Sequence, residues 1–206
     1  MSADKKIVIA THNMDKQKEM IFLLANMDIE VLTMENFPHI GEIEETGTTL
    51  HENSLIKARE VYKITGLPSL ADDTGLEVDA LNGDPGVYSA RYSGENSTYQ
   101  ENVNKLLTEL KDVPIQLRTA RFRTVVTFVH LGVELYEEGV VEGIIATEIK
   151  GIKGFGYDPI FKPLDQKLTF AEMSKYKKSL ISHRAKALEK MVQQLNKYFK
   201  NGGSIE

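Results

Sequence analysis

The chain has 206 residues, a formal net charge of −5, no cysteine, and 41% hydrophobic residues. The length suits one large domain, and the apolar fraction excludes a chain that is mainly disordered. The absence of cysteine excludes disulfides, thiolate nucleophiles and cysteine-based metal sites. The acidic balance argues against a protein dedicated to binding nucleic acid. We therefore predict a single folded domain over residues 1–206.

No part of the sequence predicts export or insertion into a membrane. The first apolar run, at residues 7–10, is too short for the core of a signal peptide. No later run approaches the ~18 apolar residues that a membrane-spanning helix needs. We expect a cytoplasmic protein that makes no contact with membranes.

Predicted strands and helices alternate in the first half of the chain. The β-branched run at 7–10 is typical of a buried parallel strand, and apolar side chains recur with helical spacing over 20–27. Thr49, with Glu52 three residues later and Gly66 at the end, predicts a capped helix over 49–66. The other predicted elements are a strand over 28–33, a loop over 34–48, a strand over 68–71, a β-rich excursion over 76–93, a helix over 97–111, a hairpin of strands 118–133 and 134–147, a glycine-rich loop over 151–159 and a helix over 175–200. Together they predict an α/β fold, with a mixed twisted sheet and flanking helices.

A polar segment with Thr11, Asn13, Lys16 and Glu19 follows the first predicted strand. In open α/β sheets, ligands bind beyond the carboxyl ends of the strands, where helix N-termini present free N–H groups. A hydroxyl, an amide and an ammonium at this place suit an anionic ligand such as a phosphate. The alternative is that Thr11 or Asn13 only caps the helix and that Lys16 is solvated. The glycines of a Walker A loop are missing.

The second cluster is acidic and consists of Asp72 and Asp73, followed by Thr74, together with Glu44 and Glu45. Adjacent carboxylates repel one another unless a cation or strong donors compensate. One or two carboxylates plus substrate phosphates are ligands that Mg²⁺ accepts. Because neighbouring side chains of an extended segment point in opposite directions, we expect only one of Asp72 and Asp73 to face the site. The alternative is an Asx turn that ends the strand.

The third cluster is the sequence Gly-Phe-Gly-Tyr-Asp-Pro at residues 154–159. Two glycines around an aromatic residue, followed by a carboxylate and a rigid proline, suit a shaped loop better than a strand or a helix. Phe155 could stack on a nucleobase, and Asp158 could accept from a ring N–H group of a purine. The alternative is a tight turn with a phenylalanine in the core.

The fourth cluster opens the last predicted helix, where Lys178, Ser182, His183 and Arg184 place four donors within two turns. Such a surface near a helix N-terminus can contact phosphates and the oxygen atoms of a base. The other histidines show no metal-binding spacing. Together, the four clusters supply anion donors, a metal site, a stacking ring and partners for a base edge, as a nucleoside triphosphate requires.

In this order and spacing, the clusters resemble the inosine/xanthosine triphosphate pyrophosphatases, the Ham1-like family. The resemblance runs from residue 7 to about residue 195, and the block over 69–94 is its most specific part. It implies Mg²⁺-dependent hydrolysis of ITP, dITP and XTP to the monophosphate and pyrophosphate, which removes deaminated purine nucleotides from the nucleotide pool. It also implies an elongated domain with two lobes around one cleft, and a homodimer.

The resemblance also implies roles for individual residues. By motif position, Asp73 is implied as the proton acceptor and as a metal ligand, and Glu44 as the other metal ligand. If His183 and Arg184 donate hydrogen bonds to the 6-oxo group of the base, the 6-amino group of ATP would instead place a donor against these donors. A buried donor left without a partner costs ~1–3 kcal/mol, which would disfavour ATP. The implied substrate-binding residues are Thr11, His12, Asn13, Lys16, Lys57, Thr74, Phe155, Gly156, Tyr157, Asp158, Lys178, His183 and Arg184, with Arg91 as a further residue on the phosphate side.

Three other interpretations stay open. A related pyrophosphatase of the Maf type, which acts on modified pyrimidine or methylated nucleotides, would share the chemistry, and a panel of substrates separates the two. A non-catalytic nucleotide-binding regulator would not need a metal site, so the presence of both Glu44 and Asp73 argues against it. A nucleic-acid-binding module fits the net charge of −5 poorly.

Overall fold

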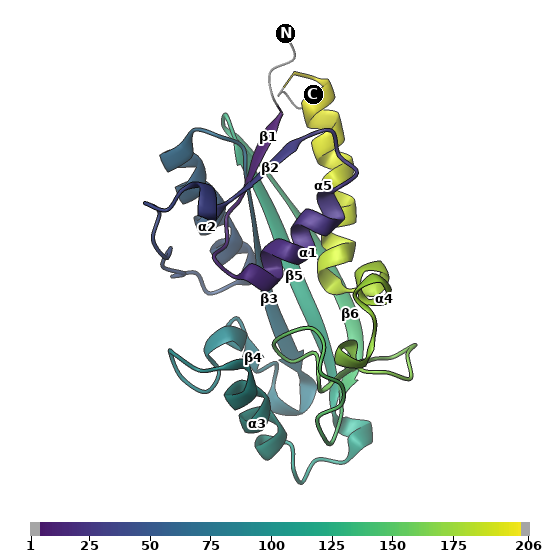
Figure 1. The fold of residues 1–206 in the computed structure, drawn as a ribbon. Coiled ribbons are helices and arrows are strands. Elements are labelled where there is room, and N and C mark those ends of the chain that lie inside the picture. Colours follow the sequence, from purple (N-terminus) through teal and green to yellow (C-terminus); the bar gives the residue numbers. More distant parts are fainter. Residues whose placement is uncertain (1–4, 203–206) are drawn as a thin grey trace. The chain divides into compact units, whose positions relative to one another are not determined.

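The computed structural model describes residues 5–202, and within them seven strands form one mixed sheet with the order β2-β1-β3-β5-β6-β7, in which β4 pairs with β3. Strand β1 pairs in parallel with β2 and β3, whereas β4 and β7 pair antiparallel with β3 and β6. The predicted α/β fold with a mixed sheet is confirmed. The strands are β1 (Lys6–Ile9), β2 (Glu30–Thr33), β3 (Ser69–Val78), β4 (Pro85–Gly86), β5 (Thr119–His130), β6 (Val133–Ile145) and β7 (Phe161–Pro163), and the helices are α1 (Met14–Leu24), α2 (Leu50–Thr65), α3 (Tyr99–Glu109), α4 (Lys175–Ile181) and α5 (His183–Lys200) (Figure 1).

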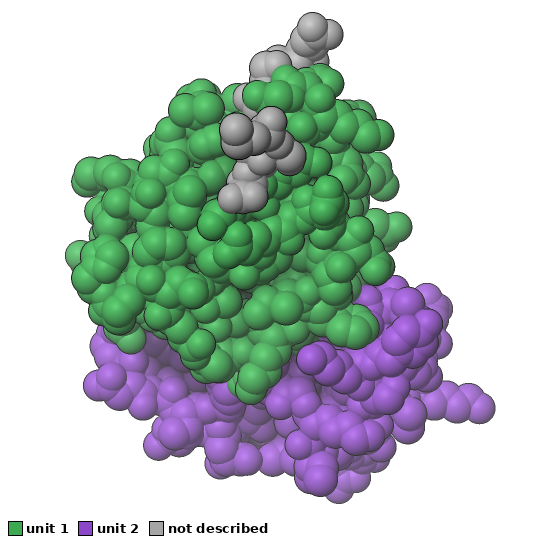
Figure 2. Space-filling view, turned by 45° about the horizontal axis from the view of Figure 1, so that its top comes forward, with its two compact units in different colours: residues 1–73, 124–139, 184–206 green, residues 74–123, 140–183 purple. Residues whose placement is uncertain are grey.

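Two compact units divide this fold (Figure 2). Unit 1 consists of residues 1–73, 124–139 and 184–206, and unit 2 consists of residues 74–123 and 140–183. The boundaries fall inside β3, β5 and β6, so each of these strands contributes residues to both units. Each unit has a hydrophobic core of its own.

The side chains of the first strand show which helices cover each face of the sheet in unit 1. Successive side chains of a strand point to opposite faces. Ile7 and Ile9 pack with residues of α1 and α5, while Val8 and Ala10 pack with residues of α2, and all four are buried. An apolar run that is buried on both faces is typical of a central parallel strand, as the sequence predicts.

Local signals set several element ends. Thr49 and Glu52 form the predicted capping box, and Gly66 follows α2 with a left-handed φ of 67°, a conformation that glycine adopts without strain. Between β5 and β6, Leu131 and Gly132 have φ values of 46° and 78°, as a tight hairpin turn requires. The predicted capped helix and the predicted hairpin are both confirmed.

Three other predictions need correction. The strand predicted over 68–71 continues to Val78, which rules out the alternative of an Asx turn at residues 72–75. The helix predicted over 175–200 is two helices, because Ser182 is extended, with ψ at 157°, and separates α4 from α5. The β-rich excursion predicted over 76–93 contains the short β4 and two 3-10 helices, Asp79–Leu81 and Ser89–Arg91. No helix within the described residues is long and apolar enough to cross a membrane.

Candidate active site

The start of α1 is held together by its own side chains. Asn13 is the N-cap, and its Oδ1 accepts from the N–H groups of Asp15 at 3.0 Å and Lys16 at 3.1 Å. Thr11 Oγ1 accepts from the N–H of Asn13 at 3.2 Å, and Gln17 Nε2 donates to the Thr11 carbonyl oxygen at 2.7 Å. Asn13 is therefore a helix cap, and these contacts fix the backbone from which Lys16 projects.

Asp72 is fully buried in β3 and binds cations from α1 and α5. Its Oδ2 accepts from Arg184 Nε at 3.1 Å and Nη2 at 2.9 Å, and it lies 3.4 Å from Lys16 Nζ. Arg184 also donates through Nη1 to Glu19. One buried guanidinium thus ties two helices to a strand within unit 1. These contacts of Arg184 are with carboxylates, and its donation to a base oxygen stays a prediction.

Asp73, the next residue of β3, belongs to a second cluster. Its Oδ1 accepts from Lys57 Nζ at 3.3 Å, and the same Nζ donates to Glu45 Oε1 at 2.6 Å. Lys57 and Asp73 are buried and Glu45 is half-buried, whereas Glu44 is exposed. The structure therefore brings Glu45, rather than the predicted Glu44, to the lysine that binds Asp73.

The two neighbouring carboxylates have opposite electrostatic surroundings. Burial by itself would raise the pKa of Asp72, but the charges of Lys16 and Arg184 outweigh burial and hold this pKa well below its usual range. Burial raises the pKa of Asp73, and the charge of Lys57 offsets this effect only in part. Asp72 is hence a fixed anion, and Asp73 is the more basic carboxylate of the two.

Asp73 and Glu45 fit a divalent cation. Asp73 Oδ2 is buried and has no hydrogen-bond partner among the described residues, so it is an oxygen that a cation could use. Within residues 5–202, no group of three or more His, Asp or Glu side chains is arranged to hold a metal ion. Proteins bind Mg²⁺ through one or two carboxylates plus substrate phosphates, and Asp73 and Glu45 would supply two such carboxylates.

In unit 2, the glycine-rich loop is ordered around the buried Asp158. Its Oδ2 accepts from the N–H of Phe155 at 2.9 Å and from Lys178 Nζ at 2.6 Å. Gly154 has a φ of 72°, and a Cβ there would lie 2.0 Å from the same Oδ2. Lys178 Nζ lies 4.8 Å from the centre of the Phe155 ring. The predicted loop is confirmed, and Asp158 orders both the loop backbone and the lysine beside the aromatic ring.

Tyr157 and His183 are buried in unit 2. Tyr157 donates its OH to the carbonyl oxygen of Ser89 at 2.9 Å, and burial raises its pKa. His183 stacks on Phe122, with 4.5 Å between the ring centres. The hydrogen bond of Tyr157 therefore joins the glycine-rich loop to the segment of Ser89. The stacking on Phe122 fixes the plane of the His183 ring.

Three further predicted residues lie at less buried positions. His12 is exposed, with Nε2 3.0 Å from the carbonyl oxygen of Gly41. Thr74 follows Asp73 in β3 and is half-buried. The guanidinium of Arg91, also half-buried, lies 5.4 Å from the centre of a tyrosine ring.

The predicted residues fall into two sets, one in each unit. Unit 1 holds Thr11, His12, Asn13, Lys16, Glu44, Lys57, Asp73 and Arg184, and unit 2 holds Thr74, Arg91, Phe155, Gly156, Tyr157, Asp158, Lys178 and His183. The sequence interpretation missed the roles of Glu45 and Glu19. Glu19 stands three residues after Lys16, a spacing that places both side chains on one face of α1 and could have predicted a shared partner.

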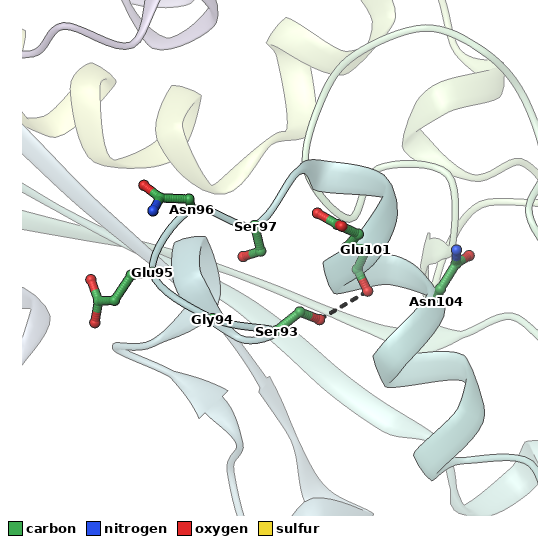
Figure 3. A pocket seen from close by; sticks show the side chains of 7 residues that line it. All are labelled: Ser93, Gly94, Glu95, Asn96, Ser97, Glu101 and Asn104. Carbon is green, nitrogen blue, oxygen red and sulfur yellow. Dashed lines mark hydrogen bonds between the residues drawn. The ribbon is translucent and has the colours of Figure 1, made fainter.

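A surface pocket of unit 2 is lined by residues of the segment 93–104 and includes none of these residues. Figure 3 shows Ser93 in this pocket, where its Oγ donates to the carbonyl oxygen of Glu101 at 3.0 Å. The pocket also presents the carboxylate of Glu95. The lining of this pocket thus includes the acidic residues Glu95 and Glu101 and no lysine or arginine, which disfavours a polyphosphate at this place.

Comparison with known proteins agrees with the motifs. The family model of the Ham1 family matches residues 7–194. A dITP/XTP pyrophosphatase of Vibrio parahaemolyticus is 47% identical over 195 residues, which cover 93% of this chain and 97% of the relative. A dITP/XTP pyrophosphatase of Bacillus cereus is 42% identical over 207 residues, which cover 97% of this chain and 98% of the relative.

Solved structures lead to the same family. A HAM1 protein from Coxiella burnetii has a TM-score of 0.85 and 42% identity, and the match covers 94% of this chain and 99% of that one. The Ham1 protein of Staphylococcus aureus has a TM-score of 0.83 and 38% identity, covering 93% and 98%. The fold, the motifs and the family model agree over nearly the whole length. This chain therefore belongs to the Ham1 family.

Proposed function

We propose that this chain is a pyrophosphatase that hydrolyses dITP, ITP and XTP to the nucleoside monophosphate and pyrophosphate. The observation that carries the proposal is the match to relatives named dITP/XTP pyrophosphatase over more than nine-tenths of both chains. Removal of these deaminated nucleotides would keep them out of newly made DNA and RNA. The chemistry available in the two units supports this activity, as follows.

Unit 1 supplies the groups for the phosphate chemistry. Lys16 and Lys57 provide positive charge for the triphosphate. Asp73 orients a water molecule toward the α-phosphorus and takes its proton, so that the new P–O bond replaces the bond to the β-phosphate and pyrophosphate leaves. A carboxylate whose pKa is raised by burial is the better base for this step.

Asp73 and Glu45 are the residues that would hold Mg²⁺. When bound, Mg²⁺ neutralises charge that develops on the phosphate oxygens. Lys57 already binds both carboxylates, at 3.3 and 2.6 Å, and so keeps them close together without the metal. Asp72, which also accepts from Arg184, lies 3.4 Å from Lys16 Nζ and so positions this lysine.

Unit 2 supplies the groups for the base. Phe155 offers a ring on which a purine can stack. His183, held in plane by Phe122, is our choice as the donor to the 6-oxo group. Asp158 acts through the loop and Lys178, since its Oδ2 already accepts from both.

The first test is a substrate panel. Pyrophosphate release is measured from ITP, XTP, GTP and ATP, each with Mg²⁺ and with excess EDTA. We expect metal-dependent release from ITP and XTP and little from ATP and GTP. Release from modified pyrimidine triphosphates alone would favour the Maf-type interpretation. Binding of ITP without hydrolysis would favour a regulator.

A second test addresses the base subsite through the loop. Gly154→Ala drives a Cβ into Asp158 Oδ2, at 2.0 Å, and so displaces the carboxylate that holds Lys178. Losing one charge-assisted hydrogen bond should raise KM for ITP about tenfold. Gly132→Ala, in the turn between β5 and β6, is the matched control, because its φ of 78° is also left-handed but no atom lies within 4 Å of the added Cβ. Equal KM values for the two variants would contradict this role of Asp158.

Other expectations from the resemblance remain part of the proposal. We propose the cytoplasm as the compartment, because it holds the nucleotide pool. We also propose a homodimer, and no binding to nucleic acid or membranes. Sedimentation equilibrium of the purified protein tests the homodimer.

A further inference from the structure

The acidic loop that carries Glu45 is fastened to the first turn of α2. Glu52 Oε2 accepts from the Thr48 N–H at 2.7 Å and from the Thr49 N–H at 3.1 Å. Asn53 Oδ1 accepts from the Gly47 N–H at 2.8 Å. Both side chains thus bind backbone donors that a loop would otherwise expose to water.

Gly47 allows an unusually close approach. A Cβ at Gly47 would lie 2.6 Å from Asn53 Oδ1 and 2.6 Å from Glu52 Cβ. Asn53 is 0% exposed. The loop backbone therefore lies directly against a buried amide, and its position depends on that amide.

The same face of α2 also binds the side chain of Glu45. Lys57 stands four residues after Asn53, and residues with this spacing neighbour each other on a helix. Asn53 holds the loop backbone at Gly47, and Lys57 Nζ holds Glu45 Oε1 at 2.6 Å and Asp73 Oδ1 at 3.3 Å. The two contacts together fix where the Glu45 carboxylate lies relative to Asp73.

We propose that Asn53 is a positioning residue, which holds the acidic loop so that Glu45 lies beside Asp73 in a geometry that binds a divalent cation. The inference rests on the proposed function, since it concerns the site of that reaction. It assigns Asn53 no contact with substrate. Loss of a residue that orients a metal ligand lowers metal affinity by about 10–100-fold.

The chain contains a matched control. Helix α3 begins with the same order of residues, in which Thr98 and Glu101 form a capping box and Asn102 follows. Asn102 is buried, and its Oδ1 accepts from the Ser93 N–H at 2.7 Å. Asn102 therefore makes the same kind of loop contact in unit 2, far along the chain from the carboxylates of unit 1. Its loss should loosen a loop without changing the cation site.

The experiment measures cation binding and loop order separately. Mn²⁺ binding to the metal-free protein is followed by electron paramagnetic resonance of the free ion. Amide hydrogen exchange reports the protection of segment 42–49. Asn53→Ala should speed exchange in this segment and weaken Mn²⁺ binding about tenfold or more. Asn102→Ala should leave Mn²⁺ binding within about twofold of wild type, although its own loop exchanges faster.

Gly47→Ala tests the same inference without removing a buried amide, and it decides the question if Asn53→Ala does not fold. The added Cβ pushes the loop away from α2, so Mn²⁺ affinity should fall as for Asn53→Ala. A folded variant of either kind that binds Mn²⁺ like wild type overturns the inference. Failure of the wild-type protein to hydrolyse ITP and XTP would overturn the proposed function instead, whatever the variants bind.

Discussion

Asp73→Asn should lower kcat for ITP by about 10³-fold, the usual contribution of a general base, while the protein stays folded. The amide cannot take a proton from water, although it keeps the size of the carboxylate and can still contact Lys57. The measurement is pyrophosphate release at saturating ITP and Mg²⁺, with circular dichroism and a thermal melt to verify the fold. A variant that keeps near-wild-type turnover would remove Asp73 from the mechanism.

The neighbouring acids provide the control for this result. Glu45 is half-buried on Lys57, whereas Glu44 is exposed. Glu45→Gln should therefore raise the Mg²⁺ concentration needed for half-maximal activity, and Glu44→Gln should leave it unchanged. If Glu44→Gln raises this Mg²⁺ concentration and Glu45→Gln does not, Glu44 is the metal ligand, as the motif implies.

Arg184→Ala should destabilise the protein by about 3–5 kcal/mol, because it removes one partner of a buried ion pair and leaves a buried charge behind. The side chains of Arg184 and Asp72 are 1% and 0% exposed. Chemical denaturation measures the change in the free energy of unfolding. The control is Arg59→Ala, which breaks the exposed pair with Glu134 and should cost ~0–1 kcal/mol. A loss below that of Arg59→Ala would show that Lys16 alone satisfies Asp72.

The same variant should change the pH dependence of stability. The pKa of Asp72 is held below its usual value of 3.8 by Lys16 and Arg184, which outweigh the effect of burial. A carboxylate with a lowered folded-state pKa stabilises the protein fully above its unfolded-state pKa, and this stability is lost as the pH falls below that value. The difference in unfolding free energy between wild type and Arg184→Ala should therefore shrink on acidification below about pH 4. The ratio of kcat/KM for ITP and ATP at neutral pH tests the predicted donation of Arg184 to the base: we expect Arg184→Ala to lower this ratio, and an unchanged ratio would show that other residues recognise the base.

Elements with local signals could be predicted from the sequence. The ends of α2 follow from Thr49, Glu52 and Gly66, whose side chains or φ angles act within one helix turn. The glycine-rich loop follows from Gly154, since a Cβ there would collide with Asp158, four residues away. In each case the interacting residues lie close together in the chain, so their contact can be inferred from the order of the residues alone.

Elements that depend on distant partners could not be predicted in the same way. The break at Ser182 lies next to the point where the chain passes from unit 2 to unit 1, so His183 belongs to unit 2 and Arg184 to unit 1. The choice of Glu45 over Glu44 depends on Lys57, and neither the spacing nor the composition of the acidic loop indicates which carboxylate the lysine meets. Arg184 and Asp72 are separated by 112 residues, so their pairing is a property of the packed helices.

The sequence by itself determined the family, the α/β class, the residue types available for phosphate, metal and base, and the alternation that sends Asp72 and Asp73 in opposite directions. These properties follow from motif order and from the period of two along a strand. Only the tertiary structure decided which lysine or arginine side chain each carboxylate binds. It also decided that Arg184 pairs with Asp72 and Glu19 inside unit 1, and that Asn53 accepts a hydrogen bond from the acidic loop. The reason is physical: the charge state and role of a buried group depend on the partners that surround it, and folding brings these partners from β3, α1, α2 and α5.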